Sequence, residues 1–151
     1  MSKKLVGASL VSAAAVAAGT VVLVTSAGAA APAKPAITKA TARYAPSTGG
    51  ADARLTVTAT VADNSGVQGL KVLAWPASSG LAPKAAEMKA VENATCKATS
   101  STASVCTYTV EDSAKDAAAM PAGTWYVSVL ATAKDRGTTF APKAATFTVK
   151  H

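Results

Sequence analysis

Residues 54–63 read Arg-Leu-Thr-Val-Thr-Ala-Thr-Val-Ala-Asp, and this stretch decides the fold. Leu55, Val57, Ala59 and Val61 alternate with more polar residues, most of them threonine. A period of two sends successive side chains to opposite faces of a β-strand. Threonine is β-branched and suits the solvent-facing side of a strand. The stretch therefore predicts a strand with one buried face and one wet face.

Further strands are predicted on both sides of this one. In residues 124–133, Trp125 and Val127 share one face while Tyr126 and Ser128 share the other. Turn signals rich in Asp, Asn, Gly and Pro separate several of the segments. The other expected strands cover residues 37–44, 67–75, 94–99, 104–110, 138–140 and 144–150. Seven to eight short strands in one domain favour a two-layer antiparallel β-sandwich, an all-β fold.

Two segments carry helical signals. Residues 81–93 are predicted to form one short inserted helix, and Pro83 suits its first turn. Its apolar positions near helical spacing are Leu81, Ala85, Met88 and Val91. Residues 113–120 are predicted to form a helical turn with Ser113 as N-cap.

The N-terminus, residues 1–29, resembles a secretory signal peptide. Lys3 and Lys4 precede an uncharged stretch, residues 5–24, and small residues follow up to Ala29. This order of a positive region, an apolar region and an A-x-A site is typical of a cleaved signal, which would begin as a helix. We therefore expect cleavage near Ala29 and a secreted protein.

A membrane anchor formed by residues 5–24 is the alternative, because twenty apolar residues can span a bilayer. The stretch is rich in small residues, and no positive stop-transfer cluster follows it. We favour cleavage, with a flexible leader at residues 30–35 and one domain at residues 36–151. We expect contact with a membrane only if the signal segment stays uncleaved.

Composition excludes several kinds of site. The chain of 151 residues has a formal net charge of +7, and its basic residues are scattered rather than clustered. A nucleic-acid groove would need clustered basic and aromatic residues, so no nucleic-acid partner is expected. The sole histidine is His151 at the last position, and there are two cysteines. These residues build neither a zinc site nor a His-based triad, so we expect no metal, no cofactor and no enzyme activity.

Cys96 and Cys106 enclose nine residues of a polar, Ser/Thr-rich loop. An even number of cysteines in a small exported domain indicates a structural disulfide. Closing so short a loop stabilises the fold by about 2–3 kcal/mol in the chain-entropy treatment.

Short stretches of the chain resemble known families. The turn at residues 61–67 and the stretch at residues 123–137 resemble bacterial immunoglobulin-like or fibronectin-III-like modules. Over residues 36–150 the chain also resembles a family of small exported actinobacterial proteins of unknown function. The matching stretches are Lys71-Val72-Leu73-Ala74-Trp75-Pro76, Ala94-Thr95-Cys96 and Gly123-Thr124-Trp125-Tyr126-Val127-Ser128. The resemblance implies export, a Cys96–Cys106 bridge and an immunoglobulin-like sandwich, and it implies no activity.

Aromatic residues are the candidates for a binding surface. Trp75, followed by Pro76, and Tyr126 could offer rings for stacking or docking. The alternative is that Trp75 plugs one end of the core, and we expect Trp125 to lie in the core.

Acidic residues are weaker candidates. Asp63 and Asp135 lie in turns near glycine, but Ca²⁺ prefers six to eight oxygen ligands, so we expect them to stabilise turns. Glu111, Asp112 and Asp116 form a small acidic cluster for which we expect a capping or solvated role.

We interpret the protein as an exported, non-catalytic β-sandwich module. It would act by surface binding to an extracellular protein or a cell-envelope polymer. The alternative is an exported protease inhibitor that presents the disulfide-strapped loop 97–105 to a protease cleft. An enzyme would have to rely on carboxylates alone.

Overall fold

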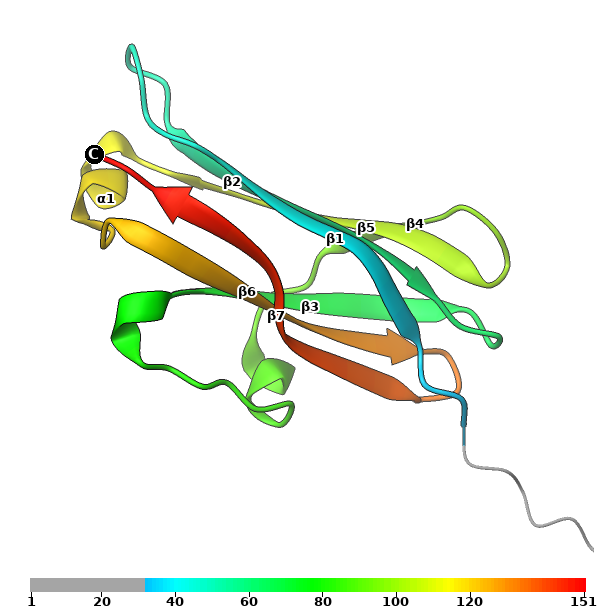
Figure 1. Ribbon diagram of the computed structural model, residues 1–151. Helices are drawn as coiled ribbons and strands as arrows, with labels where there is room; N and C mark the ends of the chain where they lie inside the picture. Colours follow the sequence, from blue (N-terminus) through cyan, green and yellow to red (C-terminus); the bar gives the residue numbers. More distant parts are fainter. Residues whose placement is uncertain (1–31) are drawn as a thin grey trace, which may run out of the picture. The chain divides into compact units, whose positions relative to one another are not determined.

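The computed structural model describes residues 32–151, and the predicted signal peptide at 1–29 lies outside the described residues. Seven strands form two stacked antiparallel sheets, which confirms the predicted all-β sandwich (Figure 1). The strands are β1 (Ala36–Ala45), β2 (Ala53–Ala62), β3 (Val67–Pro76), β4 (Thr95–Ala98), β5 (Ala103–Asp112), β6 (Gly123–Ala133) and β7 (Thr138–Val149).

The strand order is β1-β2-β5-β4 in the first sheet and β3-β6-β7 in the second. Constant-type immunoglobulin domains have this order, with four strands facing three. The predicted immunoglobulin-like sandwich therefore matches the observed topology. In the described part of the chain, no helix has the length and apolar character needed to cross a membrane.

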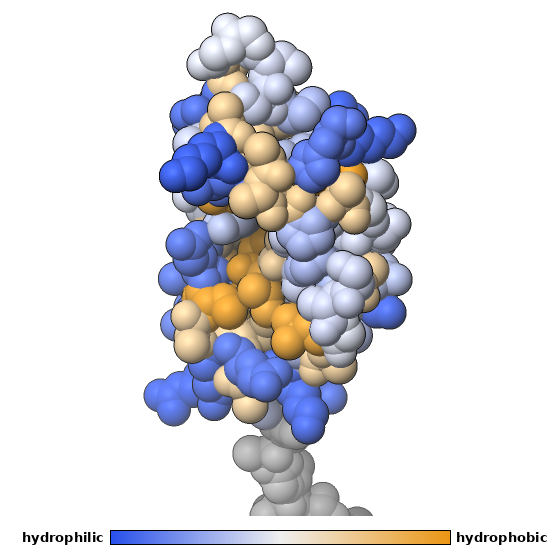
Figure 2. Space-filling view, turned by 90° about the vertical axis from the view of Figure 1, so that its left-hand side faces the viewer, coloured by the Kyte–Doolittle hydropathy of each residue, from blue (hydrophilic) through white to orange (hydrophobic). Residues whose placement is uncertain are grey.

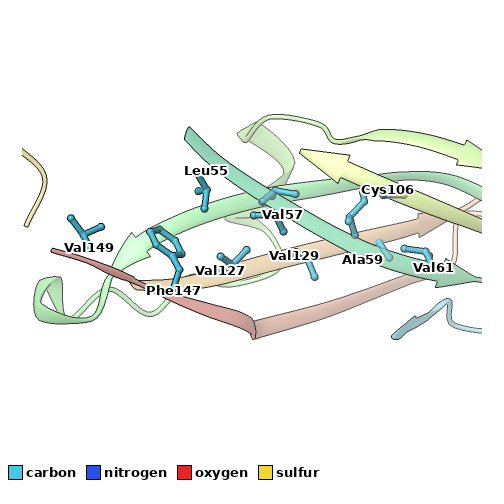
Figure 3. Close-up of a cluster of buried hydrophobic side chains, with 12 residues drawn as sticks. Leu55, Val57, Ala59, Val61, Cys106, Val127, Val129, Phe147 and Val149 are labelled. Atoms are coloured by element: carbon cyan, nitrogen blue, oxygen red, sulfur yellow. The ribbon is translucent and has the colours of Figure 1, made fainter. Parts of the chain in front are cut away.

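The core lies between the two sheets and follows the alternation seen in β2. Leu55, Val57 and Val61 are at most 3% exposed, and Ala59 is fully buried. They point toward residues of the second sheet, among them Val127 of β6 (Figure 3). The threonines between them lie on the outer face and are half-buried. The predicted buried face of this strand is thus confirmed.

The C-terminal region contains one strand where the sequence predicted two, at 138–140 and 144–150. β7 continues through both segments, with a shift of register opposite Ser128. Pro142 lies at this irregularity, where a residue without an N–H does not interrupt the ladder of hydrogen bonds. The carbonyl of Pro142 accepts a hydrogen bond from the Ser128 hydroxyl at 2.7 Å. The strand therefore bends around proline and does not end there.

The predicted helix at 81–93 is wrong. The segment between β3 and β4 contains only two 3₁₀ turns, η1 (Ala77–Ser79) and η2 (Glu87–Ala90). The chain is already extended at Val91, and the Glu92 carbonyl accepts a hydrogen bond from the Val72 N–H at 3.1 Å. Pairing with the edge of β3 thus takes the last residues that a helix would have needed.

This crossing segment lies along the second sheet, on the side away from the first (Figure 1). η2 contacts β3 and buries Met88 completely, although Met88 is not part of the core between the sheets. Leu81, predicted to share a helical stripe with Met88, is 48% exposed. Met88, together with the buried Pro83, therefore anchors the segment.

The second helical prediction is confirmed. α1 (Ala114–Ala119) lies within the expected range of 113–120. Ser113 is its N-cap, since its hydroxyl oxygen accepts a hydrogen bond from the Asp116 N–H at 3.2 Å. The Asp116 carboxylate also accepts a hydrogen bond from the Ser113 hydroxyl. The short helix is thus fixed at its start by side-chain capping.

The burial of Met88 makes a stability prediction. Met88→Ala should lower the free energy of unfolding by about 2–5 kcal/mol, because it leaves a cavity under the crossing segment. Leu81→Ala in the same segment is the matched control, and at an exposed site it should change that free energy by less than about 0.5 kcal/mol. Urea denaturation followed by circular dichroism measures both. Equal effects of the two variants would contradict the docking of this segment through Met88.

Candidate binding groove

A gap in strand pairing opens one side of the sandwich. β4 pairs only with residues 104–107 of β5, so among the described residues no strand lies beside Tyr108–Asp112 on that edge. Across the gap is the outer edge of β3. That edge is bridged at Lys71 by Asn93, and within residues 32–151 it has no partner strand from Leu73 to Pro76. Two unpaired strand edges therefore face the same opening.

A groove of about 370 Å³ lies between these edges, and we call it the β3–β5 groove. Figure 2, which views the molecule from the left-hand side of Figure 1, shows a hollow with a hydrophobic bottom. Its lining is mostly apolar: Leu55, Val72, Leu73, Ala74, Val91, Glu92, Tyr108, Val110, Asp112, Met120, Trp125 and Phe147. A concave apolar surface with a few polar groups is the usual form of a binding site.

Aromatic rings close one end of the groove. Trp125 stacks on Phe147 with ring centroids 5.7 Å apart, and Phe147 stacks on Tyr44 at the same distance. The Trp125 ring N–H donates a hydrogen bond to the Pro121 carbonyl at 2.9 Å, which fixes the ring's orientation. Trp125 packs against the core as predicted, but it is only half-buried and also lines the groove. Its ring is thus a rigid part of the wall.

The charged residues that line the groove are both acidic, Glu92 and Asp112. The Tyr108 hydroxyl donates a hydrogen bond to Glu92 Oε2 at 2.7 Å. Burial, this hydrogen bond and the charges of Glu92 and Asp112 raise the pKa of Tyr108 to about 12. Burial is the largest cause of this shift, and the two carboxylates act in the same direction through their negative charge. The groove is therefore apolar at its bottom and electronegative at its sides.

Trp75 does not form the binding surface suggested by the sequence. It is 5% exposed, and its ring N–H donates a hydrogen bond to Ser128 Oγ at 2.9 Å. Its ring lies 4.9 Å from that of Tyr126, between centroids. Trp75 is thus a buried packing residue, although on the outer side of its sheet. Tyr126 is half-buried, with Lys143 Nζ 4.2 Å from its ring centroid.

The cysteines form the predicted disulfide. Cys96 and Cys106 lie opposite each other on β4 and β5, with Cα atoms 3.9 Å apart. Much of the predicted loop 97–105 is strand, because Lys97 and Ala98 belong to β4 and residues 103–105 belong to β5 and pair with β2. Only residues 99–102 form a turn. The segment is therefore a hairpin inside the sheet.

The candidate acidic residues are dispersed in the structure. The Asp63 carboxylate accepts hydrogen bonds from the Ser65 N–H and hydroxyl, and Asp135 accepts one from the Gly137 N–H. All three bonds lie within turns, as expected. Glu111 pairs with Arg54. Within residues 32–151, no group of three or more His, Cys, Asp or Glu residues could hold a metal ion.

Sequence reasoning missed the groove because the expected strands 94–99 and 104–110 are nearly equal in length. In the structure β4 covers only Thr95–Ala98, whereas β5 runs to Asp112. Tyr108 and Val110 lie in the part of β5 beyond β4 and are half-buried. Their importance depends on β3 lying opposite, which the sequence pattern alone does not show.

A family model described as a family of unknown function (DUF5707) matches residues 37–131. The match includes β1 to β5 and most of β6, and thus most of the groove. No curated protein and no solved structure matches the chain.

The hydrogen bond between Tyr108 and Glu92 makes a pH prediction. Tyr108 should ionise near pH 12 in the folded protein, against about 10 when unfolded, so it contributes stability below pH 10 that is lost as the pH rises through 12. Glu92→Gln should lower this pKa toward 10, because it removes one negative charge. Phenolate absorbance during alkaline titration measures the shift. Tyr108→Phe is the control, and an unchanged high-pH transition in that variant would contradict the assignment.

Proposed function

We propose a role for this chain, which belongs to the DUF5707 family of unknown function: it is an exported, non-catalytic module that binds another protein through the β3–β5 groove. The observation that carries the proposal is the gap between two unpaired strand edges over an apolar groove. Unpaired edges expose backbone N–H and C=O groups that can bond to another chain. A protein segment can satisfy these groups and cover the apolar surface at once.

The lining of the groove favours a protein over a cell-envelope polymer as the partner. Leu73, Val91 and Val110 are half-buried and supply the accessible apolar part of the lining. Apolar surface of this kind gains most from covering by apolar side chains, since burial is favourable in proportion to apolar area. Glycans offer hydroxyl groups, which would lose water at this surface without gaining hydrogen bonds.

A non-catalytic role is consistent with the placement of the reactive residue types. Both cysteines are joined in the disulfide, and the ring of His151 lies beside the Met120 carbonyl at 2.8 Å. Glu92 accepts the hydrogen bond of the Tyr108 hydroxyl, and the raised pKa of Tyr108 keeps this phenol protonated. The groove thus offers contact surface and negative charge.

Export is supported by the residue pattern of 1–29 and by the disulfide, which is typical of proteins in oxidising compartments. The mature protein would then begin at Ala30. Membrane anchoring by residues 5–24 is the competing reading.

Filling the groove with a larger side chain should abolish binding of the partner protein. Ala74→Phe places a ring in the groove, and it should abolish retention of the purified chain on immobilised extracellular proteins of the producing organism. Gln68→Phe is the matched control, since it adds the same ring to an exposed position of the same strand outside the groove. Surface plasmon resonance measures retention, and unfolding midpoints verify that both variants fold.

The same measurement on protease-treated cell-wall material provides the opposing outcome. Equal retention of all variants on that material, together with no groove-dependent retention on proteins, would show envelope binding and overturn the proposal.

Export makes a separate prediction. Secretion of the full-length chain should yield a product that begins at Ala30, because signal peptidases cut after small residues. N-terminal sequencing and intact mass of the extracellular protein measure this. A membrane-bound product that keeps residues 5–24 would establish the anchor instead.

A further inference from the structure

We propose that the occupant of the β3–β5 groove is an extended peptide segment that adds to β5 as a strand and carries a lysine or arginine. This inference rests on the proposed function and names the chemistry of its partner. The added strand would run beside Tyr108–Asp112, where β4 stops. Strand addition to an open edge is a common mode of peptide recognition, with backbone bonds for affinity and side-chain pockets for selectivity.

The disulfide shows which backbone groups are free. In antiparallel sheets, directly opposed residues alternate between hydrogen-bonded pairs and closer, non-bonded pairs. Cys96 and Cys106 are a close pair, with Cα atoms 3.9 Å apart, so the pair is of the non-bonded kind. Thr107 therefore bonds toward β4. Thr109 and Glu111 are in phase with Thr107, so their N–H and C=O groups point toward the open edge.

The side chains next to this edge suit an alternating peptide. Tyr108, Val110 and Asp112 point into the groove, whereas Thr109 and Glu111 lie on the opposite face of the sheet. A strand paired with this stretch would direct every second side chain into the groove. At about 3.4 Å per residue, the open stretch accepts about five residues of peptide. Two or three apolar side chains would thus contact the groove.

The charges near the groove select the sign of the peptide. The chain as a whole is basic, with a formal net charge of +7, yet Glu92 and Asp112 are the charged residues that line the groove. Both carboxylates lie close enough to Tyr108 to add to the shift that burial causes in its pKa. A cationic residue at either end of the peptide would lie near one of these carboxylates. An acidic residue in the same place would be repelled.

The test uses synthetic peptides of known sequence. The probe is a fluorescein-labelled hexapeptide of alternating valine and threonine with a terminal lysine, and its matched counterpart has glutamate in place of lysine. Fluorescence anisotropy with the purified chain should show the lysine peptide binding about tenfold more tightly. Glu92→Gln combined with Asp112→Asn should remove this preference. Equal binding of both peptides to the unaltered chain would overturn the charge selection.

Strand addition is tested through the backbone. Thr109→Pro removes an N–H that faces the open edge, and proline is tolerated at such a position. It should weaken the lysine peptide about tenfold, whereas Thr109→Val, which keeps the N–H, should not. A second test leaves the protein unaltered and compares two peptides that are N-methylated on alternate residues. The peptide whose methyl groups replace the N–H groups facing β5 should bind more weakly than the other. Binding that is insensitive to both changes would overturn strand addition.

The outcomes separate the two proposals. If Ala74→Phe abolishes binding of a protein partner while backbone changes have no effect, the groove binds protein in another conformation. If Ala74→Phe has no effect on any binding, the proposed function itself fails. Loss of peptide binding in Ala74→Phe and Thr109→Pro, with retention in Gln68→Phe and Thr109→Val, supports both.

Discussion

The structure depends on the contact between the apolar face of β2 and the second sheet. Leu55, Val57, Ala59 and Val61 are nearly inaccessible to solvent, and they meet β6 residues such as Val127 that are equally buried. Burying this apolar area is the main favourable term in holding the two sheets together. Because the side-chain period of a strand is two, a slip of one residue would place threonine in the core. The contact thus sets the register of β1 and β5 as well.

The groove follows from how the chain crosses between the sheets. After β3 the chain covers the outer face of the second sheet, and it returns along the β3 edge at Glu92–Ala94. β4 then begins only at Thr95, beside the end of β5 that is farther from Asp112. The residues used on the outer face are therefore residues that cannot extend β4. The crossing segment therefore both covers the outer face of the second sheet and leaves the edge of β5 open.

The sequence predicted what depends on local pattern and missed what depends on distant partners. The alternation of apolar and polar residues predicted β2 and β6, the capping residue predicted α1, and the even number of cysteines predicted the disulfide. The helix at 81–93 failed because pairing of Glu92–Ala94 with β3 outweighs the helical spacing of Leu81 and Met88. The groove was missed for the same reason, since Trp125 and Val110 meet across it only after both sheets have formed. Trp75 was ambiguous because its partner, Ser128, is remote in sequence.

The disulfide also limits how the open side of the sandwich can respond to an occupant. Cys96 lies two residues after Ala94, which bonds to the β3 edge, and Cys106 is 1% exposed within the core. A covalent bond at this point ties the short strand to the sheet next to the opening, so the gap cannot widen by peeling β4 away. Selectivity between ligands would then come from steric exclusion, because the groove cannot widen to fit a ligand larger than its existing space.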